Sequence, residues 1–122
     1  MATQILYAKE VGKELKFGNM RDTVNMTEFL YEQVGDFFEE KTYYEDQDEI
    51  SYRIVSYAGV NSLIEKIGST ETKILDELKE VRGNEKKSEL ISKLKDITLL
   101  EKVIFKALLQ AGENNTKVIA LL

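Results

Sequence analysis

The residues best suited to chemistry lie between Glu28 and Glu49, where nine acidic residues accompany a single base, Lys41. Clustered carboxylates attract basic surfaces, at a rate that falls as the salt concentration rises. Tyrosines are crowded into the same region, and tyrosine is enriched at protein interfaces because a large apolar ring carries a polar tip. This pattern predicts a surface that binds a basic protein partner. The candidate contact residues are Glu39, Glu40, Tyr43, Tyr44, Glu45, Asp46, Asp48, Glu49 and Tyr52.

The acidic segment has two other interpretations. Carboxylate oxygens suit Ca²⁺ or Mg²⁺, but an EF-hand loop would continue with another oxygen ligand and a glycine after Asp46 and Asp48. Ile50 and Ser51 stand there instead, so that motif fails and we predict no metal site. The second interpretation is that the segment is a solvated loop whose acids stabilise the positive end of a following helix.

Catalysis has little support in this sequence. The chain has no histidine and no cysteine, which removes the commonest general base and every thiolate nucleophile or metal ligand. The segment Gly12-Lys13-Glu14 lacks the upstream glycine and the following Ser or Thr of a phosphate-binding loop. We therefore expect a non-catalytic protein without a cofactor.

The net charge of −5 disfavours direct nucleic-acid binding, because the phosphate backbone repels an acidic surface. No stretch approaches the ~20 apolar residues that cross a bilayer. The first residues lack a basic region followed by a long apolar run, so no secretory signal is visible. We expect a cytoplasmic protein that does not act at a membrane.

The elements that position these residues are expected to form one mainly α-helical domain, residues 1–122. The chain contains no proline, which favours long helices. Apolar residues recur at helical spacing from Asn84 to Ala111. A shorter helix, capped by Ser69 or Thr70 and ending near Val81, precedes it. The two are expected to form a helical hairpin.

Three further segments complete the predicted fold. A helix is expected from Met26 to Glu40. Residues 50–67 fit either a strand or a helix, and their length and flanking acids favour the helix. The first 18 residues form either a helix or a small β-hairpin that turns at Gly12-Lys13. With that hairpin and a C-terminal strand, the alternative fold class is α+β.

The tail, residues 116–122, ends in five consecutive apolar residues, which is unusual for a chain end. This tail either pairs as a strand with the N-terminal segment or inserts into a neighbouring subunit. Under the second alternative a homo-oligomer is expected. Its oligomerisation residues would be Val118, Ile119, Leu121 and Leu122.

The functional prediction is a binding module or inhibitor that docks its acidic, tyrosine-bearing surface on a basic partner, such as the nucleic-acid-binding groove of an enzyme. One alternative is a homo-oligomeric scaffold, assembly chaperone or particle component. Another is a binder of a small anionic ligand in a pocket between subunits, held by Arg21, Arg53 or Arg82.

Overall fold

The computed structural model describes residues 2–113 and 118–121 and shows an α+β fold. The prediction of a mainly helical fold is therefore wrong, because five strands form between and beside the helices. In chain order the elements are β1 (Ala2–Val11), β2 (Glu14–Asn25), α1 (Glu28–Val34), a short 3-10 helix η1 (Gly35–Phe37), β3 (Glu39–Glu45), β4 (Asp48–Ser56), α2 (Tyr57–Glu80), α3 (Asn84–Glu113) and β5 (Val118–Leu121).

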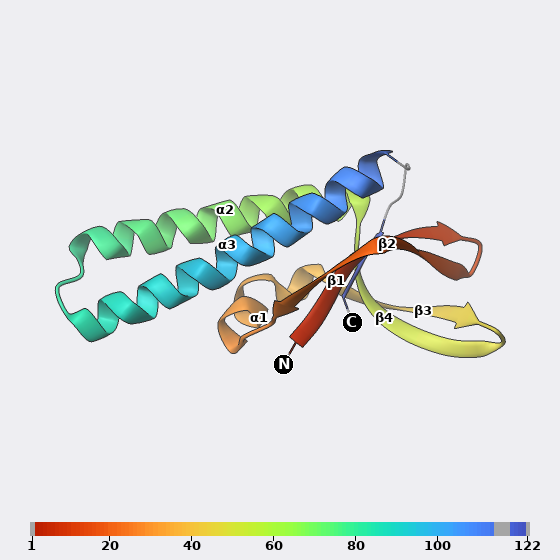
Figure 1. Cartoon of the computed structure of the whole chain (residues 1–122), viewed down its shortest axis with the longest axis horizontal. Coiled ribbons are helices and arrows are strands. Elements are labelled where there is room, and N and C mark those ends of the chain that lie inside the picture. Colours follow the sequence, from red (N-terminus) through yellow and green to blue (C-terminus); the bar gives the residue numbers. More distant parts are fainter. Residues whose placement is uncertain (1, 114–117, 122) are drawn as a thin grey trace.

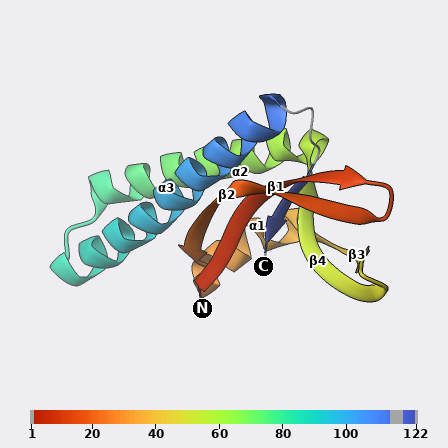
Figure 2. The same ribbon diagram turned by 45° about the vertical axis from the view of Figure 1, so that its right-hand side comes forward.

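The strands form one antiparallel sheet in the order β2-β1-β5-β4-β3. Two hairpins, β1–β2 and β3–β4, are joined by the last strand, in which Ile119 pairs with Tyr7 on one side and Val55 on the other. The long helices α2 and α3 run antiparallel beside the sheet (Figures 1 and 2). The tips of both β-hairpins point away from the turn that connects α2 to α3.

The N-terminal hairpin turns where the sequence indicates. Val11 pairs with Glu14 across Gly12 and Lys13, and Gly12 has a φ of 63°, a conformation that glycine adopts without steric cost. The helical alternative for the first 18 residues is therefore excluded.

The helical hairpin is present, but its first helix is longer than predicted. Helix α2 begins at Tyr57 and is capped by Ser56, whose Oγ accepts a hydrogen bond from the Gly59 amide at 3.1 Å. Thr70 lies inside α2, where its hydroxyl donates to the Lys66 carbonyl at 2.8 Å, and Gln33 Oε1 lies 3.3 Å from the same oxygen. Helix α3 covers the predicted Asn84–Ala111 range.

Two predicted helices are partly strands. The expected Met26–Glu40 helix is helical only from Glu28 to Phe37, and the chain is extended from Glu39. Of the segment 50–67, which was predicted to be a helix, residues 50–56 belong to β4 and residues 57–67 form the start of α2. Pairing decides both outcomes: Glu40 lies opposite Arg53 in the β3–β4 register. Pairing with another strand, which the local sequence pattern does not reveal, thus overrides the local helical preference.

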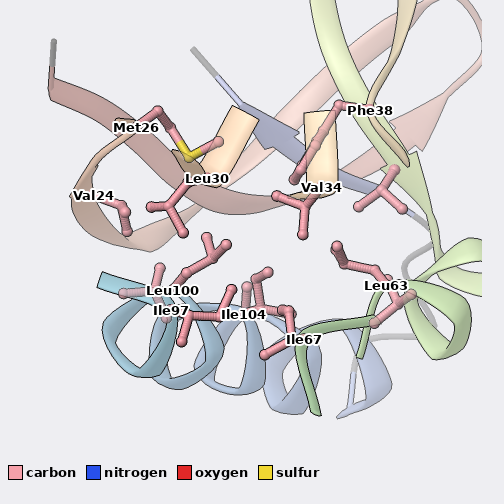
Figure 3. Close-up of a cluster of buried hydrophobic side chains, with 14 of the residues drawn as sticks. Val24, Met26, Leu30, Val34, Phe38, Leu63, Ile67, Ile97, Leu100 and Ile104 are labelled. Atoms are coloured by element: carbon pink, nitrogen blue, oxygen red, sulfur yellow. The ribbon is translucent and has the colours of Figure 1, made fainter. Parts of the chain in front are cut away.

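The main core lies between the helical pair, α1 and the end of β2. Figure 3 shows Leu30 and Val34 of α1 directed towards Ile97, Leu100 and Ile104 of α3. Leu63 and Ile67 of α2, with Val24 and Met26 near the end of β2, complete the centre of this cluster (Figure 3). In the part of the chain described, no helix is long and apolar enough to cross a membrane.

Candidate protein-binding site

The acidic residues predicted as contacts lie on the β3–β4 hairpin, which forms an edge of the sheet beyond the helices (Figure 1). Strand pairing brings Glu45 opposite Asp48 and Tyr44 opposite Glu49, so the tip concentrates negative charge. The side chains exposed to solvent are Glu39, Glu40, Tyr44, Glu45, Asp46, Asp48 and Glu49.

The turn at the tip is unusual for its residue types. Asp46 and Gln47 have φ values of 48° and 75°. A two-residue hairpin turn with positive φ at both central residues strongly prefers glycine as the second of them. Gln47 occupies that position instead, and its Cβ is crowded in this conformation. The tip therefore holds two polar side chains in a strained backbone.

The acidic residues do not form one flat surface. Side chains alternate between the two faces of a strand, so Glu45 and Asp48 share a face with Tyr43. Glu40 and Glu49 lie on the other face with Tyr44. The negative charge therefore surrounds the tip of the hairpin and does not cover one side of it.

Tyr43 is placed differently from the expectation. Its side chain is only 2% exposed, and its hydroxyl donates to Glu10 Oε2 at 3.4 Å. Tyr52 is half-buried and packs against Phe17 with ring centroids 5.5 Å apart. Tyr43 is therefore not an exposed ring of the acidic surface; it fills a small core between the hairpins.

That small core joins the β3–β4 hairpin to the β1–β2 hairpin. Tyr43 and Tyr52 lie 6.2 Å apart. The Tyr44 amide donates to the Lys13 carbonyl at 2.9 Å, and Lys41 Nζ forms an ion pair with Glu10 at 3.1 Å. The two hairpins thus support each other, although they are at opposite ends of the strand order.

Tyr44 is the predicted aromatic that remains accessible, with 38% of its surface exposed. Its hydroxyl donates to Glu49 Oε1 at 3.1 Å. Lys13 Nζ lies 5.5 Å from the centre of its ring. These contacts hold the ring at the tip without burying it.

The electrostatic environment favours neutral phenols. Burial and the Glu10 carboxylate raise the pKa of Tyr43. The hydrogen bond to Glu49 raises the pKa of Tyr44, and burial together with Glu45 raises the pKa of Tyr52. These tyrosines remain protonated at neutral pH and can serve as hydrogen-bond donors, but not as bases.

A cavity of about 210 Å³ opens between the two hairpins. Five of its lining residues are among the predicted contacts, and four are not: Ile50 of β4 and Glu14, Leu15 and Phe17 of the first hairpin. The alternation of polar and apolar residues in the Glu14–Phe17 segment is the signal that could have assigned Leu15 and Phe17 to one face.

The predicted oligomerisation residues lie in β5, apart from Leu122, which is outside the described residues. Val118, Ile119 and Leu121 pair with β1 on one side and β4 on the other. Of the two alternatives for the tail, the structure therefore shows pairing with the N-terminal strand. Both backbone edges of β5 are used within the chain.

The three arginines lie in separate parts of the fold. The Arg21 backbone belongs to β2, Arg53 lies 5.7 Å from the centre of the Tyr31 ring, and Arg82 is in the connection between α2 and α3. They do not gather into a single anion site.

No protein-family model, curated protein or solved structure matches this chain. Within the described ranges, no group of three or more acidic side chains is arranged to hold a metal ion. The candidate site is therefore defined by its own geometry. It is the acidic tip of the β3–β4 hairpin with the exposed Tyr44, and the β1–β2 hairpin packs against this hairpin.

Proposed function

We propose that this protein is a non-catalytic binding module that docks the tip of its β3–β4 hairpin on the basic surface of a partner protein in the cytoplasm. The observation that carries the proposal is the gathering of four exposed carboxylates, Glu45, Asp46, Asp48 and Glu49, at one projecting tip. Interspersed lysines or arginines would offset such a concentration, but the residues of the tip itself include none.

The support beneath the tip fits a recognition role. A binding loop that is already ordered loses less conformational entropy when a partner docks. The contacts of Tyr43, Tyr52 and Phe17 hold the hairpin from one side, and the bond between the Tyr44 amide and the Lys13 carbonyl holds its edge. Tyr44 then offers an apolar ring beside the charges, a combination that is typical of interface centres.

The test is binding of the full chain to an immobilised basic peptide, acetyl-(Gly-Lys)₆-amide, across a range of salt concentrations. The hairpin variant carries Glu45→Gln, Asp46→Asn, Asp48→Asn and Glu49→Gln. We expect it to bind roughly tenfold more weakly than the unmodified chain at low salt, and with a shallower salt dependence.

A matched control removes the same number of charges elsewhere. Glu65, Glu77, Glu80 and Glu85 are exposed on the helical pair, and their replacement by glutamine gives the same net charge. We expect this control to retain most of the binding. Equal losses in the two variants would show that net charge alone drives binding, and would contradict the proposal.

A second candidate function, self-association, is favoured by the outer side of α3. Exposed apolar side chains recur along this helix at Ile91, Leu99, Phe105 and Leu109, and exposed apolar residues that share one side of a helix are typical of protein contacts. If the chain forms a homo-oligomer through α3, the double variant Leu99→Glu, Leu109→Glu should dissociate to the mass of a monomer. Light scattering on a sizing column measures this, and a monomeric unmodified chain would exclude the function.

A further inference from the structure

The walls of the cavity between the two hairpins are aromatic. Phe17 and Tyr52 meet close to edge-on, at an interplanar angle of 69°, and Tyr43 also lines the cavity. Aromatic faces attract cations that lie within about 6 Å of the ring centre. The chain itself uses this attraction beside the cavity, since Lys41 Nζ lies 5.4 Å from the centre of the Tyr43 ring.

The lining of the cavity also includes acidic residues. Glu14 comes from β2, Glu45 from β3 and Asp46 from the turn, so three segments contribute acidic residues to the lining. Among the described residues that line the cavity, none is basic. The negative charge of Glu45 also acts on the wall, where it contributes to the raised pKa of Tyr52. The cavity therefore has the electrostatic character of a cation site.

The size of the cavity restricts the cation. At about 210 Å³ it is far larger than the ~10–15 Å³ that one water needs, yet too small for an element of secondary structure. From these features we infer that the cavity receives the guanidinium group of one arginine from the partner protein. This inference rests on the proposed function and names its central contact.

Arginine fits better than the other candidate occupants. Its planar guanidinium stacks on aromatic rings and pairs with carboxylates through two parallel hydrogen bonds, whereas a lysine ammonium does neither. A hard metal ion requires oxygen ligands around it, and the ring of Phe17 offers none. An anion would be repelled by Glu14, Glu45 and Asp46.

A second cavity shows the contrast. It measures about 460 Å³ near the start of α2 and is lined by Glu10, Asp36, Glu39 and Lys41, among others. Its lysine is already paired with Glu10 at 3.1 Å. Because this lining is of mixed charge and partly neutralised, it does not select a basic side chain as the cavity between the hairpins does.

The experiment compares two sets of three acids on the full chain, with acetyl-(Gly-Arg)₄-amide as the probe, by isothermal titration calorimetry at constant ionic strength. The lining variant is Glu14→Gln, Glu45→Gln, Asp46→Asn. The matched variant, Glu40→Gln, Asp48→Asn, Glu49→Gln, neutralises exposed acids of the same hairpin that do not line the cavity. Asn at position 46 retains a residue that tolerates positive φ.

We expect the lining variant to bind roughly tenfold more weakly than the unmodified chain, and the matched variant about twofold more weakly. Equal losses in both variants would overturn the arginine site and leave the proposed function standing, since binding would then follow the charge of the tip as a whole. Undiminished binding in both variants would overturn the site and the proposed function together.

A variant that changes no charge separates the aromatic part of the lining from the acidic part. Phe17→Leu retains an apolar side chain in the small core, and we expect it to weaken binding of the arginine peptide several-fold. In the unmodified complex, ring currents should shift the arginine side-chain protons upfield in the NMR spectrum. Unchanged affinity in Phe17→Leu, or equally tight binding of acetyl-(Gly-Lys)₄-amide to the unmodified chain, would overturn the assignment of arginine.

Discussion

The helical end and the hairpin end of this molecule are each stabilised by a different kind of interaction. At the helical end, α2, α3 and α1 share a continuous cluster of apolar side chains, with Leu63, Ile67, Ile97, Leu100 and Ile104 fully buried (Figure 3). At the hairpin end, the buried cluster among the side chains that the structure describes consists of Tyr43 and Ile54, with half-buried residues packed against them. Among the described residues, the contacts that connect the hairpins there are the aromatic contact between Phe17 and Tyr52, the ion pair and hydrogen bond that Glu10 forms with Lys41 and Tyr43, and the backbone hydrogen bond between Tyr44 and Lys13.

This difference separates stability from recognition. Burial of apolar surface supplies most of the favourable free energy of folding, so the helical end stabilises the chain. Regions with few buried contacts open at lower free energy and can adjust to a partner. The acidic tip lies on such a region, and the small core beneath it limits how far the tip can move.

The largest effect is expected in the main core. Leu63→Ala leaves a cavity where the side chain is fully buried, and should lower the free energy of unfolding by about 2–5 kcal/mol. Urea denaturation followed by circular dichroism measures this. Leu75→Ala is the matched control, since Leu75 lies on the same helix but is 46% exposed. A similar loss in both variants would contradict the role assigned to the main core.

The small core is expected to contribute less. Tyr52→Leu removes the ring contacts with Phe17 and Tyr43 but retains an apolar side chain, and should cost about 1 kcal/mol. Tyr44→Leu is the control, because that ring is exposed. If Tyr52→Leu destabilised the chain as much as Leu63→Ala, the two ends would not differ in the way the packing indicates.

The same contrast explains what the sequence could reveal. The pattern of Leu90, Ile97, Leu100 and Ile104 predicts α3 because a helix that faces a core repeats its apolar residues locally. The strands depend on pairing between distant segments, and nothing local to Tyr52 indicates Lys41 as its neighbour. This is why residues 50–56 were expected to be helical.

The candidate site was only partly predictable for a related reason. Charge is visible in sequence, so Glu45, Asp46, Asp48 and Glu49 could be assigned to an exposed acidic segment. Burial within a small core is not, since the position of Tyr43 depends on its contact with Glu10 in another hairpin. The cavity has the same origin and needs both hairpins to exist.

The strained tip gives a prediction of opposite sign. Gln47→Gly replaces a residue with φ of 75° by one that adopts this conformation freely, and should raise the free energy of unfolding by about 0.5–1 kcal/mol. Lys13→Gly is the control, since it also places glycine second in a two-residue turn but lies at a position without positive φ. Stabilisation by Lys13→Gly alone would contradict the strain assigned to the tip.

The smallest effect concerns a carboxyl group at the helical end. Glu71 of α2 has a buried Oε1 without a hydrogen-bond partner among the described atoms. Burial and the neighbouring Glu101 carboxylate of α3 raise its pKa. The folded chain therefore binds a proton more tightly than the unfolded chain does at this position.

It follows that stability should fall as the pH rises from the ordinary glutamate range through the raised pKa of Glu71, because the unfolded state then binds fewer protons than the folded one. Glu71→Gln cannot ionise, so we expect it to flatten this slope and to be more stable than the unmodified chain at neutral pH. Thermal denaturation between pH 4 and pH 8 measures both, with Glu77→Gln as the exposed control on the same helix. Because Glu71 lies in α2 beside Glu101 of α3 and belongs to neither hairpin, binding of the basic peptide should be unchanged in this variant, whereas a parallel loss of binding would show that the two ends are coupled.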